Sequence, residues 1–374
     1  MSEFKASSFT NEDGSHGPDL VGLTTFTSPY YFVPPSGTTA DRPSGSDCVP
    51  GLLRFNTDIG RLEVWRGDHW ATIQGDSPNL DGGARGVFGG GYVPGGGGDQ
   101  SRIDYVTISS LGNAITFGSL SAARRGLSGC GSATRGLFMG ASGASPQRID
   151  FITYSSTGNA TTFGTLSTNK EGNGALSSST RAISFGGDNV GSGTNVIEYM
   201  TIASESNGID FGDLLNPQTS FTGGIASSTR GVIGGGNVYP AQTATNSIQY
   251  ITISTLGNSV RFGDLTASKG NGVAVSNSTR GLFMGGSPTT NTIEFITIAS
   301  TGNAQDFGDL ILGTDSLSAC ASPSRGLYAG GRTPTTTNTI GYITILSTGN
   351  AIDFGDLTIA RFSSGACSNA HGGL

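Results

Sequence analysis

The sequence predicts an all-β protein, a six-bladed β-propeller preceded by an extended arm and a small β-meander, and three observations lead to this prediction. An Arg-Gly dipeptide, once Arg-Ala, recurs at nearly constant spacing. Each copy contains four short apolar runs, and 62 of the 374 residues are glycine, which suits many tight turns. Four strands in a repeat of this length are typical of a propeller blade. The repeat arginines are Arg85, Arg135, Arg181, Arg230, Arg280 and Arg325.

The fifth copy shows the four runs most clearly, and they are residues 272–276, 281–285, 292–299 and 304–310. The first run consists of small residues, which suits a strand crowded around a central channel. In the third run Ile293 and Ile296 point to opposite faces, so we expect this strand to be buried on both faces. The fourth run carries a phenylalanine in every copy, which we expect to pack between blades.

Glycine marks the two turns inside each copy. A glycine doublet follows the second run, and Gly-Asn, reversed as Asn207-Gly208 in the third copy, separates the third and fourth runs. Glycine enters positive φ at low cost, and asparagine tolerates it. In the second copy the doublet is Gly140-Ala141, so we expect Ala141 to keep a negative φ. The doublets are Gly90-Gly91, Gly186-Gly187, Gly235-Gly236, Gly285-Gly286 and Gly330-Gly331.

The ends of the repeat region are complementary. The first copy lacks its first run, because residues 81–84 read Asp-Gly-Gly-Ala. Residues 362–368 continue beyond the last copy and match a first run. We therefore expect residues 363–369 to pair beside residues 86–90 and to close the ring, which removes two open strand edges.

The repeat resembles the kelch β-propeller motif, in which a strand ending in a glycine doublet precedes an aromatic in the third strand and another in the fourth. The resemblance covers residues 85–374 and implies a six-bladed kelch-like propeller. The family has tryptophan in the fourth strand where this chain has phenylalanine, so this is a divergent version. It implies a fold and no function, because propellers have many unrelated roles. The third-run aromatics are Tyr105, Phe151, Tyr199, Tyr250, Phe295 and Tyr342.

The N-terminal residues lack the repeat. Residues 1–50 are rich in Ser, Thr, Gly and Pro and predict an extended docking arm, with Tyr30, Tyr31 and Phe32 as its apolar contact residues. Residues 51–84 predict a three-stranded meander and a linker. A meander this small buries little apolar area by itself, so we expect Trp65 and Trp70 to pack on a partner or on the propeller.

The meander and its lead-in resemble a hairpin found in tail-fibre, baseplate and other virion proteins of tailed bacteriophages. The matching residues are Gly-Leu-Leu-Arg-Phe-Asn-Thr-Asp from position 51, Leu-Glu-Val-Trp from position 62, Trp70, and the lead-in at positions 36–43. The Ser/Thr/Gly-rich repeats with Thr-Gly-Asn turns also resemble structural proteins of cyanophages. The resemblance implies a location in the virion.

Composition argues against several classes of function. The net charge is −7 and basic residues are not clustered, so we expect neither a nucleic-acid nor a membrane partner. The four cysteines are far apart, and the three histidines have no metal-ligand or catalytic spacing. We therefore expect no catalytic residue, no metal and no cofactor.

Two sets of residues are candidates for binding. The repeat arginines could form a cationic ring, but their repetition in an acidic protein favours a structural role, with hydrogen bonds to carbonyls or to a nearby aspartate. The loops between the second and third runs vary most in length. We expect Tyr92, Asn189, Tyr239 and Arg332 in these loops to face a ligand.

Three hypotheses of function follow. The first is a virion structural protein, in the tail, baseplate, fibre or capsid, that docks other virion proteins through its N-terminal region and assembles as a symmetric homo-oligomer. The second is a receptor-binding or glycan-binding propeller of a phage adhesion device, with a host surface glycan as partner. The third and least favoured is a propeller hydrolase.

Overall fold

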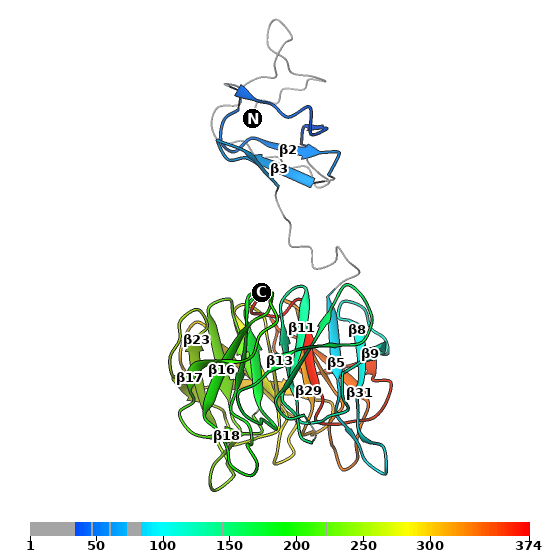
Figure 1. Ribbon diagram of the computed structural model, residues 1–374, viewed down its shortest axis with the longest axis vertical. Helices are drawn as coiled ribbons and strands as arrows, with labels where there is room; N and C mark the ends of the chain where they lie inside the picture. The colour runs from blue at the N-terminus through cyan, green and yellow to red at the C-terminus, as the bar shows by residue number, and fades with distance from the viewer. Residues whose placement is uncertain (1–33, 46–47, 60, 73–83, 144, 222) are drawn as a thin grey trace, which may run out of the picture. The chain divides into compact units, whose positions relative to one another are not determined.

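The chain divides into two compact units, residues 1–77 and 78–374 (Figure 1). The structure, a computed structural model, describes residues 34–374 apart from 46–47, 60, 73–83, 144 and 222. In these ranges the regular elements are β-strands and there is no α-helix. The prediction of an all-β protein is therefore confirmed. Tyr30, Tyr31 and Phe32 lie outside the described residues.

The first unit contains a four-stranded sheet in the order β1-β2-β3-β4. Strands β2, β3 and β4 are antiparallel neighbours and fall in the three runs of the expected meander. Strand β1 was not expected; it comes from the lead-in and pairs parallel to β2, with Ser36 opposite Phe55. The strands are β1 (Ser36–Gly37), β2 (Leu53–Asn56), β3 (Arg61–Trp65) and β4 (Trp70–Thr72).

One face of this small sheet buries polar side chains. Glu63 is fully buried, and a hydrogen bond from Arg42 of the lead-in holds the pKa of Glu63 below its ordinary value. Arg54 lies 3.5 Å from Glu63, and Asn56 donates to it at 3.1 Å. A buried carboxylate is tolerated only when such partners compensate for its lost hydration. The lead-in is thus joined to the sheet by ion pairs as well as by strand pairing.

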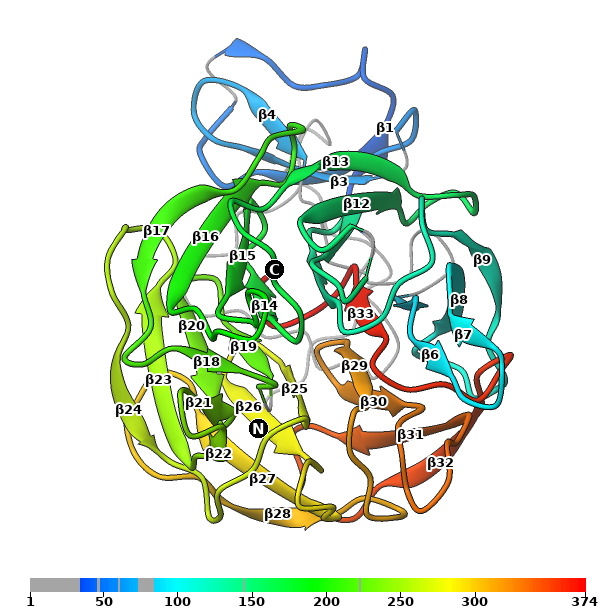
Figure 2. The ribbon, with the colours of Figure 1, turned by 60° about the horizontal axis from the view of Figure 1, so that its bottom comes forward.

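The described residues of the second unit form six four-stranded antiparallel sheets, numbered here sheet 1 to sheet 6 in chain order of their second strands (Figure 2). The first strands are β33 (Gly365–Ser368), β10 (Ser128–Gly131), β14 (Gly174–Ser177), β19 (Gly224–Ala226), β25 (Val273–Ser276) and β29 (Ser318–Ala321). The second strands are β5 (Arg85–Gly89), β11 (Arg135–Met139), β15 (Arg181–Phe185), β20 (Arg230–Gly234), β26 (Arg280–Met284) and β30 (Arg325–Ala329).

The third and fourth strands complete each sheet. The third strands are β8 (Arg102–Thr107), β12 (Arg148–Thr153), β16 (Val196–Thr201), β23 (Ser247–Thr252), β27 (Thr292–Thr297) and β31 (Thr339–Thr344). The fourth strands are β9 (Ile115–Ser119), β13 (Thr161–Thr165), β17 (Ile209–Asp213), β24 (Val260–Asp264), β28 (Gln305–Asp309) and β32 (Ile352–Asp356). Short strands in the loops are β6 (Tyr92–Val93), β7 (Gly98–Asp99), β18 (Gln218–Thr219), β21 (Asn237–Val238) and β22 (Thr243–Ala244).

Sheet 1 joins segments from opposite ends of the second unit. Strand β33 pairs antiparallel with β5, with Gly365 opposite Gly89 and Ser368 opposite Gly86. This is the pairing expected from the missing first run of the first repeat. The first strand of each sheet also contacts the first strands of both neighbouring sheets, and β33 contacts both β29 and β10. Figure 2 shows these strands gathered around the middle of the unit.

The core lies between adjacent sheets, in six separate apolar clusters, one at each junction. The third strands supply residues to both of their faces, as expected; Ile293 and Ile296 are 0% and 3% exposed and belong to the clusters on opposite sides of sheet 5. In each sheet the third-strand aromatic meets the fourth-strand phenylalanine edge to face, as Tyr105 meets Phe117 with centroids 5.7 Å apart. Such pairs stabilise beyond their buried area.

The repeat arginines connect neighbouring sheets. Each guanidinium donates to a carbonyl oxygen just after the third strand of the next sheet and lies 4.5–5.1 Å from the ring centroid of the third-strand aromatic of its own sheet. The expected structural role is confirmed, through carbonyls rather than aspartates. The pairs are Arg85–Tyr154, Arg135–Ile202, Arg181–Ile253, Arg230–Ile298, Arg280–Ile345 and Arg325–Ile108.

The glycine of Arg-Gly and the Gly-Asn turns allow close approach between sheets. A Cβ at Gly136 would lie 2.6 Å from the Sγ of Cys367 in the neighbouring first strand. Each turn asparagine accepts from a backbone N–H in the fourth strand of the preceding sheet, as Asn159 does from Ser119 at 3.1 Å. This corrects one expectation: in the five Gly-Asn turns the glycine has positive φ, but the asparagine does not, and the asparagine amide covers the exposed edge of the neighbouring sheet. Ala141 keeps a negative φ, as expected.

Buried ion pairs between sheets are a feature that the sequence analysis missed. At four junctions a cation from the segment after a fourth strand meets a third-strand carboxylate of the next sheet. In each of these pairs both side chains are at most 3% exposed, and the pairs are Arg124–Asp150, Lys170–Glu198, Lys269–Glu294 and Arg361–Asp104. At the junction of sheets 3 and 4 the equivalent residues are Gln218 and Gln249, hydrogen-bonded at 2.8 Å. At the junction of sheets 5 and 6 the hydroxyl of Tyr328 takes the carboxylate's place and accepts from Ile311 N–H at 3.2 Å.

Candidate functional site

The first strands surround a narrow channel lined by small residues. The channel consists of two cavities. The one named upper here has about 160 Å³, and the one named lower has about 60 Å³ and lies at the end near the C-terminus, which is the top of the second unit in Figure 1. The two cavities share a middle layer with one glycine or alanine from each first strand, which keeps the channel open. This layer consists of Gly129, Ala175, Gly224, Ala274, Ala319 and Ala366.

A closed ring of six peptide hydrogen bonds surrounds the mouth of the upper cavity. In the segment that leads into each first strand, one residue has a left-handed conformation, with φ between 52° and 67°. Its N–H donates to the carbonyl of the equivalent residue in the preceding sheet, at 2.7–2.9 Å, and the sixth bond returns to the first residue. The ring therefore fixes the position of every sheet relative to its two neighbours. Its members are Gly126, Gly172, Ser220, Asn271, Ser316 and Ser363.

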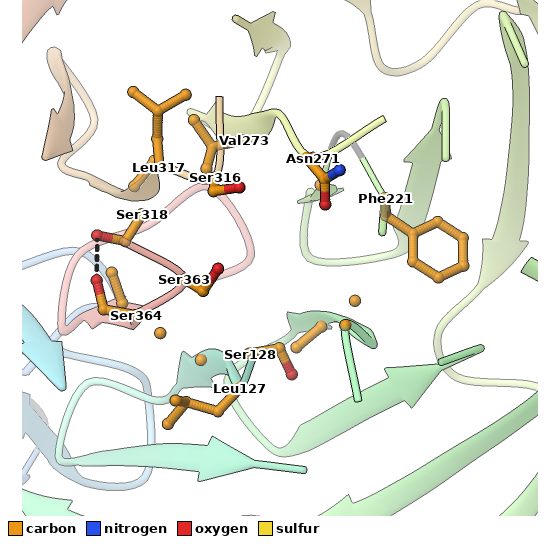
Figure 3. Close-up of a pocket in the computed structure, with 18 of the residues that line it drawn as sticks. Leu127, Ser128, Phe221, Asn271, Val273, Ser316, Leu317, Ser318, Ser363 and Ser364 are labelled. Atoms are coloured by element: carbon orange, nitrogen blue, oxygen red, sulfur yellow. Dashed lines mark hydrogen bonds between the residues drawn. The ribbon is translucent and has the colours of Figure 1, made fainter. Parts of the chain in front are cut away.

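Serine and asparagine side chains line the mouth beside apolar ones, and none of the described lining residues is charged (Figure 3). Ser364 donates to Ser318 at 3.0 Å, and Asn173 donates to Ser128 at 2.7 Å and to Ser184 at 2.9 Å. The ring carbonyls point along the ring towards the next N–H, so they are not directed at a common central point as cation ligands would be. Hydroxyl and amide groups around a cavity of this volume suit a small neutral polar molecule.

Residues 369–374 lie at the lower end of the channel, where Gly372 N–H donates to Ser276. His371 lines the lower cavity together with Cys130, Cys320 and Cys367. Burial raises the pKa of Cys130 and Cys367 to about 12, and it raises the pKa of Cys320 still further. These thiols are protonated and unreactive as nucleophiles at neutral pH. Their role here is that of small apolar residues.

Two of the predicted loop residues, Tyr92 and Arg332, come together through a residue that the sequence analysis missed. The ring of Phe362 meets Tyr92 edge to face at 5.4 Å, and the guanidinium of Arg332 lies 4.8 Å from the centroid of Phe362. Arg125, also missed, lies over Tyr92 at 4.7 Å. Tyr92 and Phe362 also form a β-bridge.

The carboxylates of two aspartates end this row of side chains. Asp99 pairs with Arg125 at 3.1 Å, and Asp315 pairs with Arg332 at 2.9 Å. The two arginine side chains remain 38% and 48% exposed. The resulting rim, defined as Asp99, Arg125, Tyr92, Phe362, Arg332 and Asp315, combines partly exposed guanidinium groups with aromatic rings.

The other two predicted loop residues belong to a separate set of contacts. The hydroxyl of Tyr239 donates to Asp188 at 2.7 Å. Burial, and to a lesser extent this hydrogen bond, raises the pKa of Tyr239 to about 12. Asn189, next to Asp188, donates its backbone N–H to Ser192. Asp188 and Glu171 also line a shallow hollow of about 210 Å³ with the exposed Val190.

The predicted docking tryptophans pack against each other within the first unit. Trp65 and Trp70 have ring centroids 5.6 Å apart, and Trp70 donates its indole N–H to the carbonyl of Pro43 at 3.2 Å. Arg54 lies 5.9 Å from the centroid of Trp70. Both tryptophans are partly buried by these contacts.

Two further kinds of feature are absent from the described ranges. No group of three or more His, Cys, Asp or Glu residues is placed there to hold a metal ion. A membrane-crossing helix, long and apolar, is likewise not found among the described residues.

No protein-family model matches the sequence, and no relative is found among curated proteins.

Proposed function

We propose that the second unit is a six-bladed kelch-like β-propeller. Three observations support this proposal. The six sheets have equal numbers of strands, their first strands contact one another in a cycle, and six peptide hydrogen bonds form a ring. In this arrangement each sheet is one blade, and the composite sheet 1 closes the ring. A rigid disc of this kind serves as a spacer or a binding platform.

We further propose that the protein is a non-enzymatic structural component of a tailed-phage virion. The observation that carries this proposal is the first unit, whose hairpin sequence resembles those of phage virion proteins and whose lead-in is tied to it through Arg42 and Glu63. Apolar side chains of this unit remain accessible; Leu53 is 40% exposed and Ile59 is 45% exposed. The first unit would dock other virion proteins, and the propeller would be displayed in a symmetric arrangement of copies.

The test is a quantitative mass-spectrometric inventory of purified particles of the phage that carries this sequence. We expect peptides from both units, at a copy number that is a whole multiple of one symmetry order of the particle. Trp70→Ala together with Leu53→Ser, two changes in the first unit, should reduce incorporation, whereas Leu346→Ser on the second unit should not. A protein that is abundant in the lysate and missing from the particles contradicts the proposal.

A second candidate function is binding of a host surface glycan, and the rim favours it. Partly exposed arginines held by aromatic rings and aspartates provide directed donors for sugar hydroxyls or carboxylates. The full chain should bind a glycan array, and Arg332→Ala and Arg125→Ala should each weaken binding at least tenfold. Leu346→Ser is the control. Equal binding by the wild-type chain and both arginine variants contradicts a role for the rim.

A further inference from the structure

The segment 369–374 forms contacts with at least four sheets at the lower end of the channel. The side chain of Asn369 accepts from Arg85 N–H in sheet 1 at 2.8 Å, and Gly372 N–H donates to Ser276 in sheet 5 at 3.1 Å. A Cβ at Gly372 would lie 2.6 Å from the carbonyl oxygen of Ala226 in sheet 4. The segment therefore passes across the channel in close contact with the surrounding backbone.

The contacts of His371 require one neutral tautomer. Its Nε2 lies 2.7 Å from the carbonyl oxygen of Gly131, which can only accept, so Nε2 carries the proton. Its Nδ1 accepts from the N–H of Gly373 at 3.1 Å and must therefore be unprotonated. Ser177 lies 3.2 Å from Nε2 and already donates to the same Gly131 carbonyl at 2.7 Å. A second proton on the ring would point Nδ1–H at the N–H of Gly373.

We propose that residues 369–374 are an acid-releasable closure of the channel, with His371 as the group that controls it. Protonation replaces the Gly373-to-His371 hydrogen bond by an opposition of two donors, and it also places a charge in a partly buried site. Both effects favour the released segment. Release would open the lower cavity, so that the channel becomes accessible from both ends.

Among the described residues that line the lower cavity with His371, no other group changes charge in the same pH range. The thiols of Cys130, Cys320 and Cys367 share the cavity, and the hydroxyl of Tyr154 lies behind Gly131. Burial raises the pKa of each of these four groups, so all stay neutral from acid to neutral pH. Arg85 directs its guanidinium to the carbonyl of Tyr154.

The direction of the pH dependence follows from linkage. Burial lowers the pKa of His371 below its ordinary 6.5, which is also the value expected for the released segment. A lowered pKa means that closure is complete above 6.5 and weakens as the pH falls from 6.5 to the pKa of the closed state. Within this window the closure equilibrium constant should fall by up to about tenfold per pH unit.

The test uses the full chain and two NMR measurements. The first is titration of the His371 imidazole, assigned with His16→Gln and His69→Gln; we expect a pKa below 6.5. The second is amide-exchange protection of Gly372 and Gly373 at pH 7.5 and pH 5, corrected for intrinsic exchange. Protection should fall at pH 5 in the wild-type chain and should not depend on pH in His371→Gln.

Several outcomes would overturn the proposal. These are an imidazole pKa at or above 6.5, equal protection of the segment at both pH values, and the same acid-dependent loss in His371→Gln. Loss of protection at Val275 and Cys367 in parallel with the segment would assign the effect to unfolding of the whole second unit. The imidazole titration needs no variant of His371, so it decides even if His371→Gln fails to fold.

Discussion

Arg325 in sheet 6 donates to the carbonyl oxygen of Ile108 in sheet 1 at 3.0 Å, although 217 residues separate them along the chain. The same contact joins every other pair of neighbouring sheets between residues about 70 positions apart. Arg325 also donates to Ser109 at 3.0 Å and lies 5.0 Å from the ring centroid of Tyr342. The last sheet is therefore joined to the first by the interaction that the repeat uses throughout.

Replacing this arginine should destabilise the second unit. Arg325→Ala removes two charge-assisted hydrogen bonds and a cation–π contact, and we expect a loss of about 2 kcal/mol in the free energy of unfolding. Urea denaturation measures it. Arg261→Ala is the control, because Arg261 is exposed and its pair with Asp264 is a surface ion pair, which contributes about 1 kcal/mol or less. Equal losses for the two variants would contradict a structural role for the repeat arginine.

The buried ion pairs should behave as coupled units. Lys170→Gln leaves Glu198 without its cation in a site that is 1% exposed, so we expect a cost of about 3–5 kcal/mol. The double variant Lys170→Gln with Glu198→Gln copies the Gln218–Gln249 junction of sheets 3 and 4. It should recover most of the loss in the same denaturation experiment. If the two single losses simply add in the double variant, the coupling is absent.

The composite sheet allows a test by truncation. Removing residues 363–374 deletes β33, leaves the edge of β5 unpaired and breaks the ring at Ser363. The expected cost is several kcal/mol, comparable to the stability of many domains. A truncation after residue 368 is the matched control, since it removes the channel closure and keeps β33. Thermal unfolding should show a much lower midpoint for the first truncation than for the second; equal midpoints would mean that β33 contributes little.

Close approach between sheets predicts an intolerant glycine. In Gly118→Ala the new Cβ would lie 2.0 Å from the carbonyl oxygen of Gly158, so one of the two sheets must shift, at a cost of about 3 kcal/mol. Gly313→Ala is the control, because its Cβ would meet its nearest neighbour at 3.5 Å and its φ is not positive. Chemical denaturation of both variants should separate them clearly. A tolerated Gly118→Ala would contradict the tight contact at this junction.

The sequence alone determined the local pattern of the second unit. Four runs per repeat, the glycine doublets and the aromatic of the third strand are set by neighbours within one repeat, so they can be read without knowledge of the fold. The complementary ends of the repeat region also predicted the pairing of β33 with β5. The same pattern predicted that the fourth-run phenylalanines pack between sheets, and Phe117 lies 3% exposed in the cluster between sheets 1 and 2.

Only the tertiary structure decided what joins one sheet to the next. Lys170 and Glu198 lie in different repeats, and an acidic residue in an apolar strand gives no indication of its partner. The ring residues vary between glycine, serine and asparagine, because the ring uses their backbone and not their side chains. Phe362, Arg125 and His371 gain their contacts from segments far away in the chain. Local patterning follows from the chemistry of adjacent residues, whereas the junctions, the rim and the channel closure depend on which segments the closed ring brings together.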